Sequence, residues 1–230
     1  MTSRPLRYAY LGFAMLGAAV LGAFVYDRLA ARRGATAVPP PASSAHPSAA
    51  SGAPTVPARI PAVTLKDLDG RPRALGEFAG RSLVINFWAT WCAPCRREIP
   101  LLNRIQREYA GKGFEVVGIA VDFAEDVRAY VQRVPIDYPL LTGEEDGLEA
   151  ARAFGVASMA FPFTAFTDRA GDVVTVHLGE LHALPAEAIL AIVARIDSGE
   201  LGLEAARTAV REALRTLPAA ASSAEKPAAG

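Results

Sequence analysis

The sequence contains only two cysteines, Cys92 and Cys95, and their spacing makes them the first candidates for chemistry. They follow the apolar run from Leu83 to Trp88, which predicts a strand, and the segment from Ala93 to Ala110 predicts a helix. Cys92 then lies at or just before the first helical turn, where unpaired backbone N–H groups and the helix dipole favour a thiolate. We therefore predict that Cys92 is a nucleophile.

Cys95 lies one turn further along the predicted helix and is expected to be the more buried thiol. We predict that it attacks a mixed disulfide between Cys92 and a substrate, which releases the reduced substrate and closes the Cys92–Cys95 disulfide. Pro94 suits the first helical turn because its missing N–H is not needed there, and its ring limits how the two sulfurs approach.

Two other uses of the cysteine pair stay open. A structural disulfide is the first, although closing a four-residue loop adds only about 2 kcal/mol of stability. Binding of Cu(I) by the two thiolates is the second, although no methionine or histidine lies near the pair in the sequence.

Charge and histidine content argue against two classes of binding site. The sequence has 24 Lys and Arg against 24 Asp and Glu, so no excess positive charge favours a nucleic-acid partner. The three histidines, His46, His177 and His182, have no zinc-finger spacing and are expected to be structural or solvated. We predict no metal site and no cofactor.

The amino-terminal region predicts a membrane anchor. Residues 8–26 carry no charge, and nineteen helical residues at about 1.5 Å each approach the thickness of a bilayer core. We predict a single transmembrane helix within residues 1–33. A cleaved signal peptide with the small residues 35–37 at its cleavage site is the alternative, although the apolar stretch is long for one.

Composition divides the rest of the chain into three parts. Residues 34–57 are rich in Pro, Ala, Ser and Gly and predict an extended linker. Residues 218–230 predict a disordered tail. Residues 58–217 have the size of one domain.

Within this domain, apolar runs of strand length alternate with helical patterns, which predicts an α/β fold with a mixed sheet. Turn sequences at 67–70 and 168–171 predict two hairpins. The expected strands are 63–65, 71–75, 83–88, 114–121, 138–141, 163–167 and 173–178. The expected helices are 93–110, 125–133, 147–154, 185–197 and 203–217.

The segment from Gly80 to Pro100 reads GRSLVINFWATWCAPCRREIP, and an earlier segment reads LKDLDGRPRALGEFAGR. Both resemble the thioredoxin superfamily, specifically its membrane-anchored TlpA/ResA/DsbE-like thiol–disulfide oxidoreductases. The resemblance extends from Ile60 to Ile196. It implies a thioredoxin-like fold, with a central mixed sheet flanked by helices and an amino-terminal β-hairpin extension. It also implies a Cys-x-x-Cys redox centre and a membrane tether.

Several residues near the cysteines gain a role from this resemblance. Glu98 matches an acidic residue that aids proton transfer to and from the thiols, although an ordinary solvated glutamate is the alternative. Asn86 stands where cytoplasmic thioredoxins place a buried aspartate, so that route for deprotonating Cys95 is absent. Trp91 is assigned to active-site support, and Pro100 matches a proline that kinks the helix.

Pro162 resembles the cis-proline of the superfamily, which faces the cysteines and pairs with substrate backbone. Ala160 and Phe161, just before it, are assigned to substrate docking. The resembling proteins usually have three residues between a Gly-Val pair and the proline, whereas five follow Val156 here and the bulky Phe161 precedes Pro162. A trans-proline at the start of a strand is the alternative.

The function implied by the resemblance is thiol–disulfide exchange outside the cytoplasmic membrane, on its periplasmic or extracytoplasmic side. The absence of histidine between the cysteines favours a reductase, because strongly oxidising relatives often have Cys-Pro-His-Cys. Its partners would be protein thiols and disulfides, such as apocytochrome c or the copper-site thiols of an oxidase during assembly. A membrane electron donor would be needed for re-reduction.

Two further functions are weighed against this one. A peroxiredoxin is excluded because its Pro-x-x-x-Thr-x-x-Cys signature would need threonine at Ala89 and proline at Ile85. A non-catalytic copper carrier or docking module that uses the same two thiols remains the alternative. The extra helix at 203–217 is expected to add packing, with dimerisation or partner docking as the other possibility.

Overall fold

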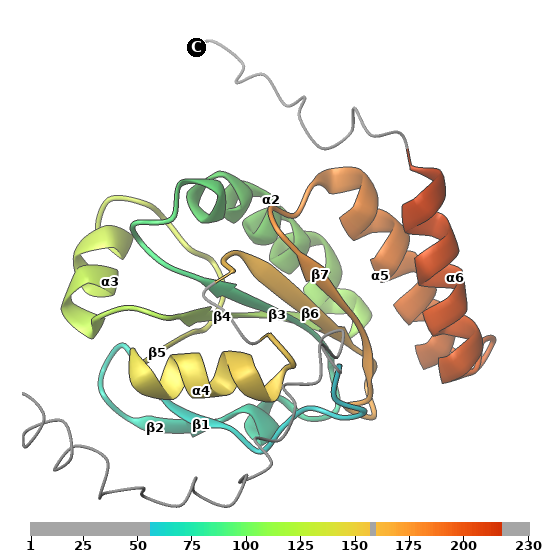
Figure 1. The fold of residues 1–230 in the computed structure, drawn as a ribbon, viewed down its shortest axis with the longest axis horizontal. Coiled ribbons are helices and arrows are strands. Elements are labelled where there is room, and N and C mark those ends of the chain that lie inside the picture. Colours follow the sequence, from blue (N-terminus) through green and yellow to red (C-terminus); the bar gives the residue numbers. More distant parts are fainter. Residues whose placement is uncertain (1–55, 157–159, 218–230) are drawn as a thin grey trace, which may run out of the picture. The chain divides into compact units, whose positions relative to one another are not determined.

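The computed structural model describes residues 56–156 and 160–217 (Figure 1). The predicted anchor, almost all of the predicted linker and the predicted tail lie outside the described residues. Within the described ranges, none of the helices has the length and apolar character needed to cross a bilayer.

The described domain is built on one seven-stranded mixed sheet in the order β2-β1-β5-β4-β3-β6-β7. The central strands β3, β4 and β5 are parallel, whereas β6 runs antiparallel to β3. β1 and β2 form an antiparallel pair, as do β6 and β7. The strands are β1 (Thr64–Asp67), β2 (Pro72–Ala74), β3 (Ser82–Trp88), β4 (Phe114–Ala120), β5 (Leu140–Thr142), β6 (Phe163–Thr167) and β7 (Val173–Leu178).

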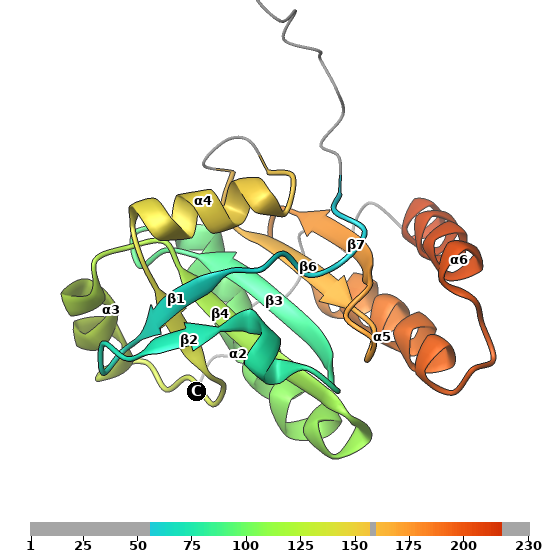
Figure 2. The ribbon, with the colours of Figure 1, turned by 90° about the horizontal axis from the view of Figure 1, so that it is seen from below.

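Helices cover both faces of the sheet, so the predicted α/β class is confirmed (Figure 2). α4 lies over one face, and α2 and α5 lie over the other, with α6 beyond α5. The α-helices are α2 (Ala93–Tyr109), α3 (Ala124–Val131), α4 (Glu145–Ala153), α5 (Ala183–Asp197) and α6 (Leu203–Thr216), and the 3-10 helices are η1 (Leu75–Phe78) and η2 (Ala110–Lys112).

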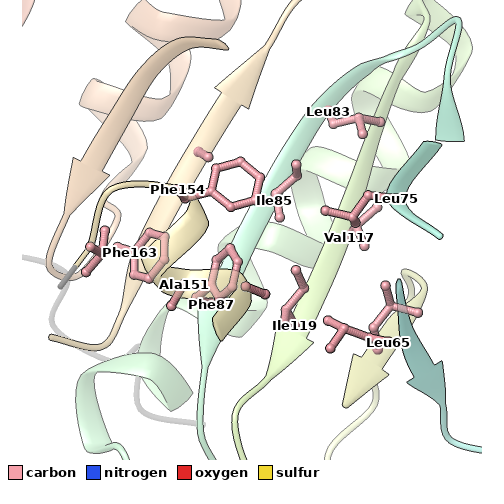
Figure 3. Packing of buried hydrophobic residues seen from close by; sticks show 14 of the residues in the cluster. Leu65, Leu75, Leu83, Ile85, Phe87, Val117, Ile119, Ala151, Phe154 and Phe163 are labelled. Carbon is pink, nitrogen blue, oxygen red and sulfur yellow. The ribbon is translucent and has the colours of Figure 1, made fainter. Parts of the chain in front are cut away.

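Strand β3 is buried along its whole length because both of its faces are covered. Leu83, Ile85 and Phe87 point towards α4, into a hydrophobic cluster with Ala151 and Phe154 (Figure 3). The alternate residues of β3 point towards α2, as the twofold repeat of a strand requires. β3 therefore contributes to two different environments.

Strand β5 differs from its predicted position because of Pro139. Proline has no N–H to donate to a ladder, and the ladder with β4 begins one residue later, at the pair Gly118 and Leu140. The carbonyl oxygen of Pro139 still accepts the N–H of Gly118 at 2.9 Å. Tyr138, predicted as a strand residue, instead lies before the strand with its side chain buried.

The extra helix α6 packs against α5 and beside strand β7, which forms one edge of the sheet. Ala206 and Val210 are its buried residues. The Arg207 guanidinium donates to the carbonyl oxygen of Val173 in β7 at 2.7 Å from Nη2 and 3.2 Å from Nε. α6 thus shields the Val173 end of an edge strand that would otherwise offer unpaired backbone groups to another chain.

Candidate active site

The two cysteines are joined by a disulfide at the start of α2, with their Cα atoms 5.3 Å apart. Cys92 is the N-cap residue, and its Sγ accepts the backbone N–H of Cys95 at 3.3 Å. Cys92 is 5% exposed and Cys95 is fully buried. After reduction, the same helix terminus would stabilise a thiolate on Cys92, the sulfur that a substrate can reach.

The loop before the disulfide is held by Asp122, a residue that the sequence analysis did not single out. Its Oδ2 accepts the backbone N–H of Thr90 at 2.9 Å and the hydroxyl of Thr90 at 2.6 Å. The Arg96 guanidinium donates to the Thr90 carbonyl at 2.9 Å. The sequence did contain a signal for this role. Asp122 follows β4 almost directly, and the parallel strands β3 and β4 end at the same edge of the sheet, so Asp122 lies near the loop that follows β3.

The residues assigned to substrate docking lie beside the disulfide. The Phe161–Pro162 peptide bond is cis, and β6 begins immediately afterwards next to β3. Phe161 packs against the cluster of buried residues that contains both cysteines. The Trp91 side chain is 57% exposed, and its ring lies edge-on to Phe161 with centroids 6.4 Å apart. Ala160 is exposed, so Trp91, Ala160 and Phe161 can meet an incoming chain.

Glu98 is buried, with an exposed fraction of 1%. Its Oε1 accepts from Asn86 Nδ2 at 2.7 Å and its Oε2 accepts the backbone N–H of Leu181 at 2.7 Å. Burial, with a smaller contribution from the charge of Glu180, raises the pKa of Glu98 to about 8 against the opposing effect of these two hydrogen bonds. The solvated alternative for Glu98 is therefore wrong.

Two elements hold the partners of Glu98 in place. Asn86 Nδ2 also donates to Thr164 Oγ1 at 3.1 Å, which ties β3 to β6. Leu181 lies in the loop between β7 and α5, and the neighbouring Glu180 accepts from Arg97 of α2, with 3.0 Å between Nε and Oε2. The Arg97 contact fixes the loop whose N–H reaches Glu98.

Histidine and acidic residues form no metal site among the residues with described positions. His177 Nε2 lies 3.3 Å from the Glu180 carbonyl oxygen, and burial lowers the pKa of this imidazole. The arrangement around α2 is suited to disulfide exchange: a reachable sulfur, a buried second sulfur and a carboxyl group that can exchange a proton near neutral pH.

Comparison with known proteins places this geometry in a family. The Redoxin family model matches residues 55–190. Thioredoxin-like protein YneN of Bacillus subtilis is 34% identical over 127 residues, which are 54% of this chain and 71% of that protein. Thiol-disulfide oxidoreductase ResA of Halalkalibacterium halodurans is 32% identical over 116 residues, which are 50% of this chain and 64% of that protein.

A solved structure supports the same assignment. The crystal structure of a putative thiol:disulfide interchange protein DsbE from Chlorobium tepidum is similar, with a TM-score of 0.51 and 26% identity. The match covers 70% of this chain and 99% of that one. The chain belongs to the Redoxin family, among the TlpA/ResA/DsbE-like thiol–disulfide oxidoreductases of the thioredoxin superfamily.

Proposed function

We propose that this thiol–disulfide oxidoreductase is a reductase that is tethered to the cytoplasmic membrane and acts on the extracytoplasmic side. The observation that carries the chemical part is the Cys92–Cys95 pair at the start of α2, with the carboxyl group of Glu98 buried one helical turn beyond Cys95. The uncharged stretch at residues 8–26 supports the tether.

In the proposed reaction the reduced enzyme gives two electrons to a substrate disulfide. The Cys92 thiolate attacks one substrate sulfur, the substrate S–S bond breaks, and a mixed disulfide with Cys92 forms while the first substrate thiolate leaves and takes up a proton. The Cys95 thiolate then attacks Cys92 Sγ, which closes the Cys92–Cys95 disulfide and releases the second substrate thiolate.

Glu98 is proposed to accept the proton of the Cys95 thiol before this second attack. A buried thiol is ionised with difficulty in apolar surroundings, so Cys95 needs a nearby proton acceptor. Asn86 cannot serve, because an amide has no titratable proton in this range. The carboxyl group of Glu98, with its pKa raised to about 8, matches the task near neutral pH.

The proposed substrates are protein disulfides with apolar neighbours, such as disulfides formed by the haem-binding cysteines of apocytochrome c or by the copper-site cysteines of an oxidase. The exposed Trp91 ring and the adjoining Phe161 supply an apolar surface beside Cys92. Both cysteines of the sequence lie in this one site. Re-reduction therefore requires a dithiol donor, which we propose is a membrane protein that carries electrons from the cytoplasm.

The test is the reduction potential of the full chain, equilibrated in defined thiol–disulfide buffers. A value near or below about −270 mV, that of thioredoxin, is expected for a reductase, whereas a value near −120 mV would identify an oxidant and overturn the reductive assignment. Cu(I) affinity measured in parallel distinguishes the copper carrier: tight binding without disulfide turnover would replace the enzyme proposal.

A further inference from the structure

Three buried polar atoms have no hydrogen-bond partner among the described residues: Asn86 Oδ1, Trp88 Nε1 and Tyr138 Oη. In folded proteins, the great majority of such groups bond to protein or to ordered water. Three of them together need a physical explanation.

All three groups come from one region, between the sheet and α2. Asn86 and Trp88 are two residues apart on β3 and so share the face that points towards α2. Gly118 of β4 pairs directly with Asn86. A Cβ atom at Gly118 would lie 2.6 Å from Leu140 Cδ2, 2.9 Å from the ring carbon Cε2 of Tyr138 and 3.3 Å from Trp88 Nε1. The indole N–H and the Tyr138 ring, whose Cε2 adjoins the carbon that carries the hydroxyl, therefore both approach the one position in β4 that lacks a side chain, next to the apolar Leu140.

Glu98 borders the same region. Its Oε1 is held by Asn86 Nδ2 at 2.7 Å, and each carboxylate oxygen retains a further lone pair. Burial raises the pKa of Tyr138, and the charge of Glu98 adds to this effect. The region thus contains two donors, the indole N–H and the phenol O–H, and two acceptors, the amide oxygen of Asn86 and the carboxylate. One water molecule has the complementary capacity, since it accepts two hydrogen bonds and donates two.

We propose that Asn86, Trp88 and Tyr138 enclose a bound water molecule that hydrogen-bonds the Glu98 carboxyl group, and that Tyr138 is a positioning residue for the proton carried by Glu98. The water accepts from Trp88 Nε1 and Tyr138 Oη and donates to Asn86 Oδ1 and Glu98. The inference rests on the proposed role of Glu98 in proton transfer and extends it to a residue 40 positions away in the sequence.

Other charged groups also act on Glu98 and must be held constant in a test. Glu180 approaches it from the loop after β7, where it is paired with Arg97 of α2, and His177 contacts the Glu180 carbonyl oxygen. The two thiols titrate only in the reduced protein, so the oxidised protein isolates Glu98. With the phenol donor removed, the water is a poorer donor to the carboxylate, and the pKa of Glu98 should rise.

The sequence offers a direct probe, because Trp88 and Trp91 are its only tryptophans. Indole 15N labelling of the full, oxidised chain gives two N–H signals, and the buried one reports on the proposed site. We expect the Trp88 signal to titrate with a midpoint near 8, the pKa of Glu98. The titration should disappear in Glu98→Gln and shift upward by about half a pH unit or more in Tyr138→Phe.

Tyr130→Phe is the matched control, because the Tyr130 ring packs 5.5 Å from that of Trp88 and the variant also loses one phenol oxygen. It should leave the midpoint unchanged. An identical midpoint in wild type and Tyr138→Phe would overturn the positioning role of Tyr138.

A nuclear Overhauser cross-peak between the Trp88 indole proton and water tests the water itself. It is expected in wild type and in Tyr138→Phe, where no phenol proton can relay it. A cross-peak absent from both chains, or present only in wild type, would overturn the bound water. If Tyr138→Phe fails to fold, absence of the cross-peak from wild type still overturns the bound water. These readouts need no turnover, so unchanged disulfide exchange in Glu98→Gln would refute the proposed proton transfer while leaving the water site standing.

Discussion

The two faces of strand β3 differ in chemistry although they alternate along the same seven residues. The face towards α4 presents Leu83, Ile85 and Phe87 to a hydrophobic cluster that includes Ala151 and Phe154. The face towards α2 presents Asn86 and Trp88, two of the residues with unpartnered polar atoms, and lies against the buried Glu98. The α4 face carries only apolar side chains, which burial stabilises. The α2 face packs against the carboxyl group of Glu98, whose ionised form is destabilised by burial.

The α4 face of β3 thus contributes mainly to folding stability, and the α2 face contributes to the chemistry of the site. Apolar burial at about 25 cal/mol per Å² favours folding on the α4 face, where the side chains of Leu83, Ile85 and Phe87 have no polar atom to satisfy. On the α2 face, burial disfavours ionised Glu98 and so brings its pKa towards the range in which thiols exchange protons. Variants on the two faces should therefore have different signatures.

The largest expected effect is on the α2 face, at the cysteines. Cys92→Ser should abolish disulfide exchange, because the attacking sulfur is lost, whereas Cys95→Ser should accumulate mixed disulfides between Cys92 and substrate. Loss of the four-residue disulfide loop should lower the free energy of unfolding by only about 2 kcal/mol. Turnover assays and gel separation of mixed disulfides measure the first effect, and urea unfolding measures the second. Full turnover in either variant would contradict the assigned mechanism.

The next effect belongs to the α4 face. Ile85→Ala should lower the free energy of unfolding by about 2–5 kcal/mol, because it leaves a cavity in a fully buried apolar core. The pH dependence of thiol alkylation should stay that of wild type, since Ile85 points away from Glu98. A shifted pH profile in Ile85→Ala would show that the two faces are coupled and would contradict their separate roles.

Glu98→Gln, unlike Ile85→Ala, should raise the free energy of unfolding. The pKa of Glu98 is about 8 in the folded chain against an ordinary value of 4.5. Between these values the folded chain keeps a proton that the unfolded chain has released, so the free energy of unfolding falls as pH rises and levels off above about 8. Glu98→Gln has no carboxyl group to ionise, so its free energy of unfolding should be higher than that of wild type by about 1–4 kcal/mol at high pH. At low pH the two free energies should be nearly equal.

Urea unfolding of the oxidised proteins at about pH 4 and about pH 9 measures how the difference in the free energy of unfolding between variant and wild type changes with pH. Glu108→Gln, on an exposed position of the same helix, is the control and should follow wild type at both values. A parallel offset between wild type and Glu98→Gln at all pH values would mean that Glu98 titrates normally, and its assigned role would fall.

The smallest effect is expected at Glu180. Its charge raises the pKa of Glu98, so Glu180→Gln should lower that pKa by a fraction of a unit, and the midpoint of thiol reactivity should move with it. Glu187→Gln, which removes an exposed carboxylate near Arg104, is the matched control. An upward shift in Glu180→Gln would indicate that the loop carrying Leu181 has moved away from Glu98.

Local patterns in the sequence were sufficient for the architecture. The apolar run at 83–88, the turn at 67–70 and the helical pattern after Cys92 each depend on neighbouring residues, and the structure has an element at each. The position of the two cysteines between a predicted strand and a predicted helix favoured redox chemistry over the alternatives, and both sulfur atoms lie within one helical turn. β5 was displaced from its predicted position because Pro139 cannot donate to the ladder.

The surroundings of Glu98 required the tertiary structure. Leu181 donates to it from 83 residues away, and Tyr138 reaches the same region because Gly118 leaves room for its ring. The sequence determined which residues alternate on β3 and where the cysteines meet a helix, since both follow from backbone periodicity. Only the order of strands in the sheet decided that a loop after β7 supplies a donor to this carboxyl group and that a tyrosine before β5 lies close enough to sense its charge, because local periodicity carries no information on which distant segments become neighbours.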